Sequence, residues 1–340
     1  MATTKSRRPW GLVLALVYLV LVALVWVLIR GWGDVSWFAT VLLFGPRWVY
    51  AVPLVVVLPA AALCRRRRLL ALAATGVAAL LVGVINDVRV PFPAFGARSE
   101  GPRLRVMTYN IGGGTFEPRE LMALIEEVGA DVVGLPECGH RVDPAAALAK
   151  GYTVHDDNGA CLITRLPVRA VDIRDPTDFW VLYGSGVINR YELEWQGKPF
   201  SIEVVHLETV REGLEALRFG FWKPSWEGPK VMGENISERL LESRRAFEWT
   251  ARSKLPTLVL GDFNMPVESA IYREVWSPLH NAFSERGVGR GITKATRLHG
   301  IRIDHILYDD KWLCDRVWVT RDLGMDHRPL VADLPLRGGQ

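Results

Sequence analysis

The sequence predicts a mixed α/β domain with stacked sheets, preceded by about three transmembrane helices. Three observations lead to this prediction. Long uncharged apolar runs fill most of residues 11–85, an alternating pattern begins at Leu104, and strand-like segments outnumber helical periods from there on. Residues 1–98 hold 11 of the 41 Lys and Arg residues but only two of the 37 acidic residues, so residues 99–340 carry a formal net charge of −5. That balance does not indicate a broad phosphate-binding face.

The N-terminal 87 residues are predicted to form a membrane anchor. The candidate spans are residues 11–29, 48–64 and 69–85, and the first has 19 residues without a charge. At 1.5 Å per residue such a helix crosses the hydrocarbon core of about 30 Å. Pro53 and Pro59 kink the second candidate but are tolerated in membranes. A cleaved signal peptide is the alternative for the first run, which is longer than the usual apolar region and lacks a clear cleavage site.

Basic residues predict how the anchor is oriented. One cluster lies at residues 5–8 and another, RRRR, at residues 65–68 between the second and third candidate spans. By the positive-inside rule both stay cytoplasmic, so the chain from about Asn86 onward is extracytoplasmic. An alternative role for RRRR is a patch for nucleic acid or lipid. Residues 88–103 contain Pro, Gly and Ser without a clear period and are predicted to be a linker.

The four cysteines indicate no metal site. Cys64, Cys138, Cys161 and Cys314 are widely scattered, with no CxxC pair. The spacing suggests neither zinc nor a disulfide framework. We therefore expect buried thiols that act as small apolar side chains.

Residues 104–336 are predicted to form one folded domain, whose catalytic role follows from the residues described below. Residues 103–111 alternate as a strand, and residues 117–129 carry a helical period with proline near the start and glycine at the end. A short apolar run follows at residues 130–138, as expected for a strand that is covered on both faces. A second helical period covers residues 235–254. Further predicted strands are residues 160–168, 200–208, 257–264, 301–309 and 329–334.

Polar residues recur where these predicted strands end. A rigid sheet positions side chains at strand ends, so binding and catalytic groups gather there. Each residue alone has an ordinary explanation, such as a turn or a solvated charge. Their recurrence at six strand ends favours a common site. The residues are Asn110, Glu137, His206, Asp262, Asn264, Asp304, Asp326 and His327.

The chemistry of this set favours phosphoester hydrolysis. Carboxylates and amide carbonyls are the hard oxygen ligands that Mg²⁺ prefers. The two histidines supply donors to a phosphoryl oxygen and can move protons. In GDFN, the strand period of two is expected to place Asp262 and Asn264 on one face. One side chain then takes a proton from water while the other steadies an oxygen beside it.

Seven segments together resemble the endonuclease/exonuclease/phosphatase superfamily, which includes DNase I, repair nucleases similar to exonuclease III, neutral sphingomyelinases and inositol polyphosphate 5-phosphatases. They cover residues 104–334 in the family's order: VMTYNI, DVVGLPEC, CLITRLPV, VVHL, GDFN, RIDHIL and MDHRPLV. The resemblance implies a DNase I-like four-layer αββα sandwich whose active site lies at one edge of the two sheets. It also implies Mg²⁺ or Mn²⁺, with Asn110 and Glu137 holding the metal and Asp326 acting beside it. Met325 departs from the family's usual serine before the Asp-His pair.

The resemblance also implies the catalytic roles. Asp262 would orient or deprotonate the attacking water, and Asn264 would bind the phosphate and position that water. His206 would contact the phosphate. His327, held by Asp304, would stabilise the pentacovalent transition state. Attack would be in line on phosphorus, without a covalent enzyme intermediate.

Three interpretations of the function remain open at this stage. The first is a membrane-tethered phosphoesterase acting on a lipid or cell-envelope phosphate, since the tethered arrangement also resembles a bacterial membrane subgroup of this superfamily. The second is a membrane-anchored nuclease for extracytoplasmic DNA or RNA. The third is a non-catalytic membrane scaffold. The expected partners are the lipid bilayer and the phosphoester substrate, and the sequence indicates no protein partner.

Substrate choice is expected in residues 209–235, where basic and aromatic residues are interleaved. Such a segment can stack nucleic-acid bases or lie at a membrane interface. An ordinary loop packed on the sheet edge is the alternative. Arg141, Arg165 and Arg190 are further candidates for phosphate contacts.

Overall fold

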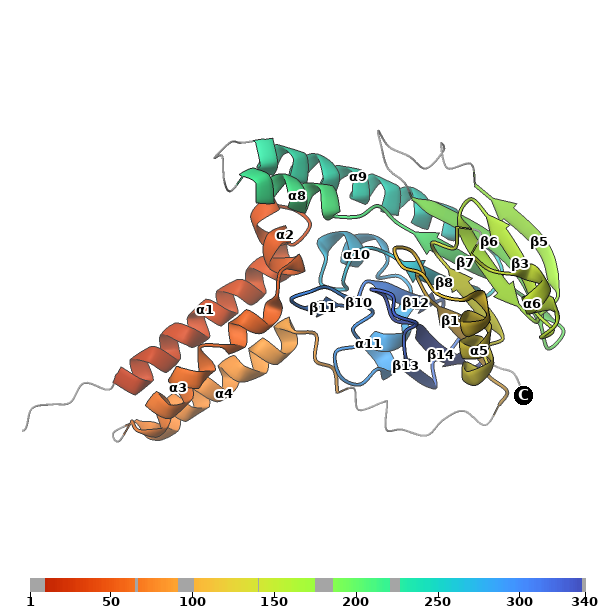
Figure 1. The fold of residues 1–340 in the computed structure, drawn as a ribbon. Coiled ribbons are helices and arrows are strands. Elements are labelled where there is room, and N and C mark those ends of the chain that lie inside the picture. Colours follow the sequence, from red (N-terminus) through yellow and green to blue (C-terminus); the bar gives the residue numbers. More distant parts are fainter. Residues whose placement is uncertain are drawn as a thin grey trace, which may run out of the picture. The chain divides into compact units, whose positions relative to one another are not determined.

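The computed structural model describes residues 10–64, 67–90, 101–139, 141–174, 186–220 and 227–337. Two compact units divide the chain, residues 1–88 and residues 89–340 (Figure 1). Part of the predicted linker, residues 91–100, lies outside the described residues. Arg89, at the start of that linker, belongs to the second unit, where its backbone exchanges two hydrogen bonds with Gly289 (2.9 and 2.8 Å).

The N-terminal unit is helical. Its elements are α1 (Trp10–Trp32), α2 (Trp37–Phe44), the 3₁₀ helix η1 (Arg47–Ala51), α3 (Leu54–Ala62) and α4 (Arg68–Ile85). Helices α1 and α4 are long and apolar enough to cross a membrane. Inside this unit, Arg47 is buried and donates hydrogen bonds to the carbonyl oxygens of Leu43 (3.0 Å) and Ile85 (2.9 Å).

The predicted span at residues 48–64 is not one continuous α-helix. Pro53 precedes α3, and η1 lies before it, so the segment is divided where proline interrupts the helical hydrogen bonds. Together with α2 this segment forms a pair of helices bent by 83°, which is either one broken span or a re-entrant loop. Within its described residues, 10–64 and 67–88, the unit therefore contains two candidate spans, or three if the bent pair crosses once.

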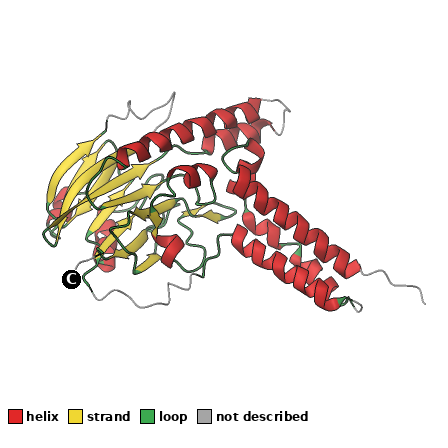
Figure 2. Ribbon diagram, turned by 180° about the vertical axis from the view of Figure 1, so that it is seen from behind, coloured by secondary structure: helices red, strands yellow, loops and turns green. Residues whose placement is uncertain are grey.

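Two six-stranded sheets form the second unit within its described residues (Figures 1 and 2). The first sheet has the order β13-β14-β1-β2-β4-β3 and the second the order β5-β6-β7-β8-β12-β9. The first sheet contains β1 (Leu104–Thr108), β2 (Val132–Leu135), β3 (Thr153–Asp157), β4 (Ala160–Thr164), β13 (Arg316–Val319) and β14 (Leu330–Leu334). The second contains β5 (Val168–Ile173), β6 (Val187–Trp195), β7 (Lys198–His206), β8 (Thr257–Asp262), β9 (His280–Asn281) and β12 (Asp304–Tyr308). A short hairpin joins β10 (Lys294–Ala295) and β11 (Gly300–Ile301).

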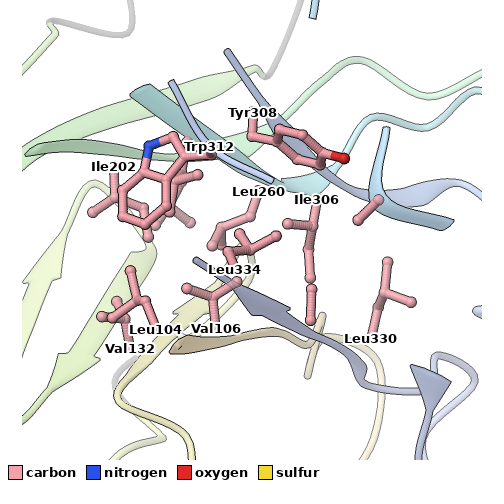
Figure 3. Packing of buried hydrophobic residues seen from close by; sticks show 14 of the residues in the cluster. Leu104, Val106, Val132, Ile202, Leu260, Ile306, Tyr308, Trp312, Leu330 and Leu334 are labelled. Carbon is pink, nitrogen blue, oxygen red and sulfur yellow. The ribbon is translucent and has the colours of Figure 1, made fainter. Parts of the chain in front are cut away.

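The main core lies between the two sheets. Figure 3 shows Val106 and Val132 of the first sheet in one cluster with Ile202, Leu260 and Ile306 of the second. All five are fully buried, and burial of each such side chain contributes about 1.5–3 kcal/mol. The sheets approach closely here, because a Cβ atom at Gly134 would lie 2.1 Å from Leu260 Cδ1.

Helices cover the outer face of each sheet. Helix α5 (Pro118–Val128) packs its apolar side on the first sheet, and it ends at Gly129 in a left-handed conformation (φ 68°). Helices α9 (Glu227–Thr250) and α10 (Ala270–Val275) pack on the second sheet. The smaller helices are α6 (Pro144–Leu148), α8 (Arg211–Gly220) and α11 (Ala282–Arg286). The mixed α/β fold with two stacked sheets is thus confirmed, and its layers agree with a DNase I-like sandwich.

The expectation of buried thiols without a disulfide is wrong for two of the four cysteines. Cys138 and Cys161 form a disulfide, with their Cα atoms 5.7 Å apart. The β2–β4 pairing explains the contact, because Leu135 lies opposite Cys161 and the backbone of Cys138 donates to the Gly159 carbonyl at 2.8 Å. Their separation of 23 residues gives no sign of this pairing in the sequence. Cys64 and Cys314 are free and buried, as expected.

Candidate active site

Strand register brings the predicted residues to one edge of the sandwich. Strands β7 and β8 are parallel, with His206 opposite Asp262, while antiparallel β12 places Asp304 on the other side of Asp262. In the first sheet, β1 and β2 are also parallel, so Asn110 and Glu137 follow neighbouring strand ends. The two sheets therefore contribute side chains to one site.

Asp262 lies at the centre of this site and is 1% exposed. Its Oδ2 atom accepts a hydrogen bond from Asn110 Nδ2 at 3.0 Å. The same oxygen lies 3.6 Å from His327 Nε2 and 4.0 Å from His206 Nε2. Burial, and after it the charge of Asp304, raises the pKa of Asp262. A carboxylate with a raised pKa accepts a proton more readily than an exposed one.

His327 is oriented by Asp304. Its Nδ1 atom lies 2.9 Å from Asp304 Oδ2, which leaves Nε2 on the side of Asp262. Burial alone would lower the pKa of His327, but Asp304 and Asp262 raise it to about 9. Burial alone would raise the pKa of Asp304, but the imidazolium of His327 holds it below its usual value. At neutral pH the site thus contains an imidazolium that lies between the side chains of Asp304 and Asp262.

Asn264 reaches the site in a different way from the one predicted. Strand β8 ends at Asp262, and Asn264 adopts a left-handed conformation (φ 50°), so the period of two does not extend to it. Instead, its backbone N–H donates to Asp262 Oδ1 at 2.8 Å, which closes a tight turn. Its side chain donates to the Leu207 carbonyl at 2.7 Å and lies 3.3 Å from His206 Nε2. The turn, and not the strand period, brings the two residues together.

Residues 107–327 match the sequence profile of the Endonuclease/Exonuclease/phosphatase family. The chain belongs to this family. Family members are metal-dependent phosphoesterases and nucleases, so the chain is an enzyme that hydrolyses ester bonds. No curated protein matches it by sequence.

Several solved structures share the fold of the family domain. A humanized D. rerio TDP2 is 14% identical, with a TM-score of 0.52 over 68% of this chain and 99% of that chain. D. rerio TDP2 complexed with a single-strand DNA product is also 14% identical, with a TM-score of 0.51 over 69% and 100%. The Neisseria 3′ phosphatase NExo, bound to a product DNA hairpin, is 15% identical, with a TM-score of 0.50 over 68% and 99%. At these identities the likeness shows the fold alone.

The donor set fits the divalent cation on which the family depends. Asn110 Nδ2 donates to Glu137 Oε1 at 2.9 Å as well as to Asp262, so two carboxylates converge on one amide. Ligand atoms of Glu137, His206 and Asp262 all lie within 4.8 Å of one another. The side chain of Glu137 is 44% exposed, whereas Asp262 is buried, so one carboxylate reaches solvent and the other faces the protein. Hard oxygens gathered in this way suit Mg²⁺ or Mn²⁺.

The structure does not join Asp326 to this group. Its half-exposed carboxylate pairs with Lys294 Nζ at 2.5 Å, and among the described residues it makes no ion pair or hydrogen bond with Asn110 or Glu137. The backbone of Asp326 accepts from Ala295 N at 2.7 Å, which ties it to the β10 strand. A role for Asp326 beside the metal stays a prediction.

Replacement of Glu137 by glutamine is expected to raise the metal concentration required for half-maximal activity by about 10- to 100-fold, the range found when a metal site is weakened by one substitution. The substitution keeps the shape of the side chain but removes its charge. Titration of activity with Mg²⁺ at saturating substrate measures the change. Glu127→Gln is the matched control, because Glu127 is an exposed partner of Arg321. An unchanged Mg²⁺ requirement in Glu137→Gln would count against the ligand role.

Three arginines that were candidates for phosphate contacts are instead bound within the fold. Arg141 donates to the carbonyl oxygens of Ile111 (2.5 Å) and Gly114 (3.0 Å), and so holds the loop after β1. Arg165 lies over the Tyr152 ring, with its guanidinium carbon 4.7 Å from the centroid. Arg190 forms an ion pair with buried Glu203, whose Oε1 atom lies 2.8 Å from Arg190 Nη2.

For residues 209–235, the structure corrects the alternative of an ordinary loop, while a role in substrate choice stays a prediction. Residues 221–226 lie outside the described residues, but the flanking chain forms α8 and the start of α9, so the segment is not an ordinary loop. Lys230 pairs with Glu234 one turn later on the exposed side of α9.

Sequence analysis missed two residues that fix the surroundings of the site. Lys294 pairs with Asp326 through its side chain and with His327 through a backbone bridge. Thr293 Oγ1 accepts hydrogen bonds from Ile303 N and Asp304 N, both at 3.1 Å, and so fixes the start of β12. Neither residue belongs to a strand-end motif, and no local pattern indicated them.

Proposed function

We propose that this protein is a membrane-tethered, metal-dependent phosphoesterase in which an activated water attacks phosphorus in line. The observation that carries the proposal is the environment of Asp262 Oδ2. One amide donor at 3.0 Å and two imidazole nitrogens at 3.6 and 4.0 Å surround this oxygen. A proton acceptor, hydrogen-bond donors for a phosphoryl oxygen and a protonated imidazole thereby lie within reach of one reacting centre.

The residues divide the work by their positions. Asp262 accepts a proton from the attacking water through Oδ2, while its Oδ1 is occupied by Asn264 N. Asn264 and His206 direct donors to a phosphoryl oxygen. His327 presents its protonated Nε2 to the charge that develops on phosphorus, and Asp304 keeps the ring in this orientation.

Glu137 and Asn110 are the residues that would hold the divalent cation. When bound there, the ion supplies positive charge that neutralises the phosphoryl oxygens. Asn110 Oδ1 now accepts from Gly112 N at 2.8 Å, so the amide oxygen also fixes the loop that follows β1.

A lipid or cell-envelope phosphoester is the substrate that we propose. Helices α1 and α4 support a tether, and a tether raises the local concentration of a substrate held in the same membrane. The net charge of −5 on residues 99–340, and the arginines engaged within the fold, favour a compact phosphate group over a long polyanion. An extracytoplasmic nuclease is the alternative outcome of the test.

The test offers the detergent-solubilised full-length protein four substrates with Mg²⁺: plasmid DNA, single-stranded RNA, a polyprenyl phosphoester and a phospholipid phosphoester. Release from the lipid substrates, lost in Asp262→Ala, is the expected result. Cleavage of nucleic acid alone would replace our proposal with a tethered nuclease. No hydrolysis of any substrate would favour the scaffold interpretation.

We also propose that residues 89–340 lie on the extracytoplasmic side. The basic clusters at residues 5–8 and 65–68 support this topology, and so does the Cys138–Cys161 disulfide, because disulfides persist in oxidising compartments. For a loop of this length the disulfide should stabilise the fold by about 3 kcal/mol.

Alkylation of the protein in intact cells, followed by non-reducing peptide mapping, tests this prediction. Cys138 and Cys161 should be recovered as one linked peptide, and Cys314 as a free thiol that reacts only after unfolding, because it is buried. Recovery of Cys138 and Cys161 as separate alkylated thiols would contradict both the disulfide and the side of the membrane inferred from it.

A further inference from the structure

A buried arginine lies directly behind the candidate active site. Arg239, on α9, is 1% exposed. Its Nη2 atom donates to the carbonyl oxygen of Asn264 at 3.0 Å, and its Nε atom donates to the carbonyl oxygen of Glu208 at 3.3 Å. The guanidinium therefore bridges two backbone segments that are far apart in the sequence.

These two segments carry the phosphate-binding side chains. Glu208 lies two residues after His206, the last residue of β7, and Asn264 lies two residues after Asp262, the last residue of β8. Asn264 has the left-handed backbone conformation, which is unfavourable for a residue with a side chain and persists only where neighbouring contacts hold it. Its N–H is held by Asp262 and its carbonyl by Arg239, so the peptide groups on both sides of this residue are fixed.

The same face of α9 makes further contacts with the first segment. Asn235, four residues before Arg239, donates to the Thr209 carbonyl at 2.9 Å. Glu242, three residues after Arg239, accepts from the backbone of Glu208 at 2.8 Å. Residues at these spacings share one face of a helix. The polar side chains on this face of α9 thus form hydrogen bonds with backbone groups, at positions where an outer helix normally buries apolar side chains.

Arg239 shares this buried cluster with an acidic residue. Glu242 is 1% exposed, and burial raises its pKa to about 8, while Arg239 acts in the opposite direction. A buried cation is costly unless it is paired and hydrogen-bonded. An apolar side chain would pack α9 on the sheet without that cost but would hold neither carbonyl oxygen.

We propose that Arg239 is a positioning residue, which sets the distance between His206 and Asn264 by clamping the segments after β7 and β8. This inference rests on the proposed function of the same site. His206 Nε2 and Asn264 Nδ2 are 3.3 Å apart, and both must reach the same phosphoryl group. Displacement of one segment by about 1 Å would cost about 100-fold in rate.

Three variants of the full-length protein test the proposal. Arg239→Met keeps length and apolar bulk but removes the donors. Arg239→Lys restores a cation and one donor. Arg244→Met is the matched control on the same helix, because Arg244 is half exposed and pairs with Glu274 on the surface. In Arg239→Met we expect kcat to fall about 100-fold, while KM should change by less than about threefold. In Arg239→Lys we expect kcat to be at least about tenfold higher than in Arg239→Met. Arg244→Met should behave as the wild type.

Two further measurements separate positioning from simple destabilisation. Guanidinium at low millimolar concentration should partly restore kcat in Arg239→Ala but should not affect Arg244→Ala. The imidazole resonances of His206, assigned by their loss in His206→Gln, should shift in Arg239→Met and remain in place in Arg244→Met. This second readout needs no turnover, so it tests the clamp even if no phosphoester is hydrolysed.

The outcomes distinguish this inference from the proposed function. Wild-type hydrolysis that Asp262→Ala abolishes supports the function, whatever Arg239 does. A folded Arg239→Met with wild-type kcat and unshifted His206 resonances would overturn the positioning role. Loss of activity in step with loss of folded protein, without recovery in Arg239→Lys or with guanidinium, would also overturn it and leave a structural role.

Discussion

Replacement of Asp262 by alanine is expected to lower kcat by about 10³- to 10⁴-fold, because it removes the proton acceptor from the centre of the site. No neighbouring group replaces it. His327 is protonated near neutral pH, since its pKa is about 9, and Asp304 is already engaged with His327 at 2.9 Å. The effect should appear in kcat more than in KM, because the substrate retains its contacts with His206 and Asn264.

The measurement compares steady-state kinetics of the wild type, Asp262→Ala and Asp262→Asn at saturating Mg²⁺. Asp310→Ala is the matched control, because Asp310 is exposed and contacts only the surface residue His280 by a described hydrogen bond. Retention of more than a tenth of wild-type kcat in Asp262→Ala would refute its assignment as the proton acceptor.

Asp262→Asn should also leave stability unchanged or raise it. Burial and the nearby charge of Asp304 both disfavour the ionised form of Asp262 in the fold. Asparagine removes the negative charge of Asp262 and with it the repulsion between Asp262 and Asp304, which lowers stability in an active site that needs both carboxylates. A lost rate without a lowered melting temperature would separate the catalytic effect from unfolding.

The strands that carry the site were predictable because both of their faces are buried. β1, β2, β4, β8, β12 and β14 are buried along nearly their whole length, and all lie within predicted segments, as does most of β7. Among the longer strands, β3, β5, β6 and β13 were not predicted. β3, β5 and β13 lie at sheet edges, where β5 is almost wholly exposed and β3 is at least half-exposed, so their apolar residues form no clear pattern. β6 is an inner strand, but its partly buried pattern was not recognised in the sequence.

Contacts that depend on tertiary structure were not predictable. The strand-end rule found Asp262 and Asn264, but only the turn geometry explains how Asn264 reaches His206. Arg239 lies within an ordinary helical period, and nothing nearby in the sequence distinguishes it from Arg244 on the surface. Cys138 and Cys161 meet only because β2 pairs with β4.

Replacement of His327 by alanine is the second change with a large expected effect, a fall in kcat of about 10²- to 10³-fold. The imidazolium is the charged donor closest to Asp262, and at 2% exposure it acts in a site from which water is largely excluded. The control is Arg302→Lys, which alters a buried cation beside His305 on β12 and leaves the His327–Asp304 pair intact.

The pH profile gives a sharper test of His327 than the rate alone. Its pKa is raised to about 9, so the active protonated form dominates below that pH and is lost as the pH rises through 9. We expect kcat/KM of the wild type to fall along this alkaline limb. In Asp304→Asn the partner charge is gone while the shape is kept, so the limb should move to lower pH, towards the ordinary histidine value of about 6.5. In His327→Ala the limb should be absent. An alkaline limb at the same pH in all three proteins would assign it to another group and remove His327 from the role of the acid.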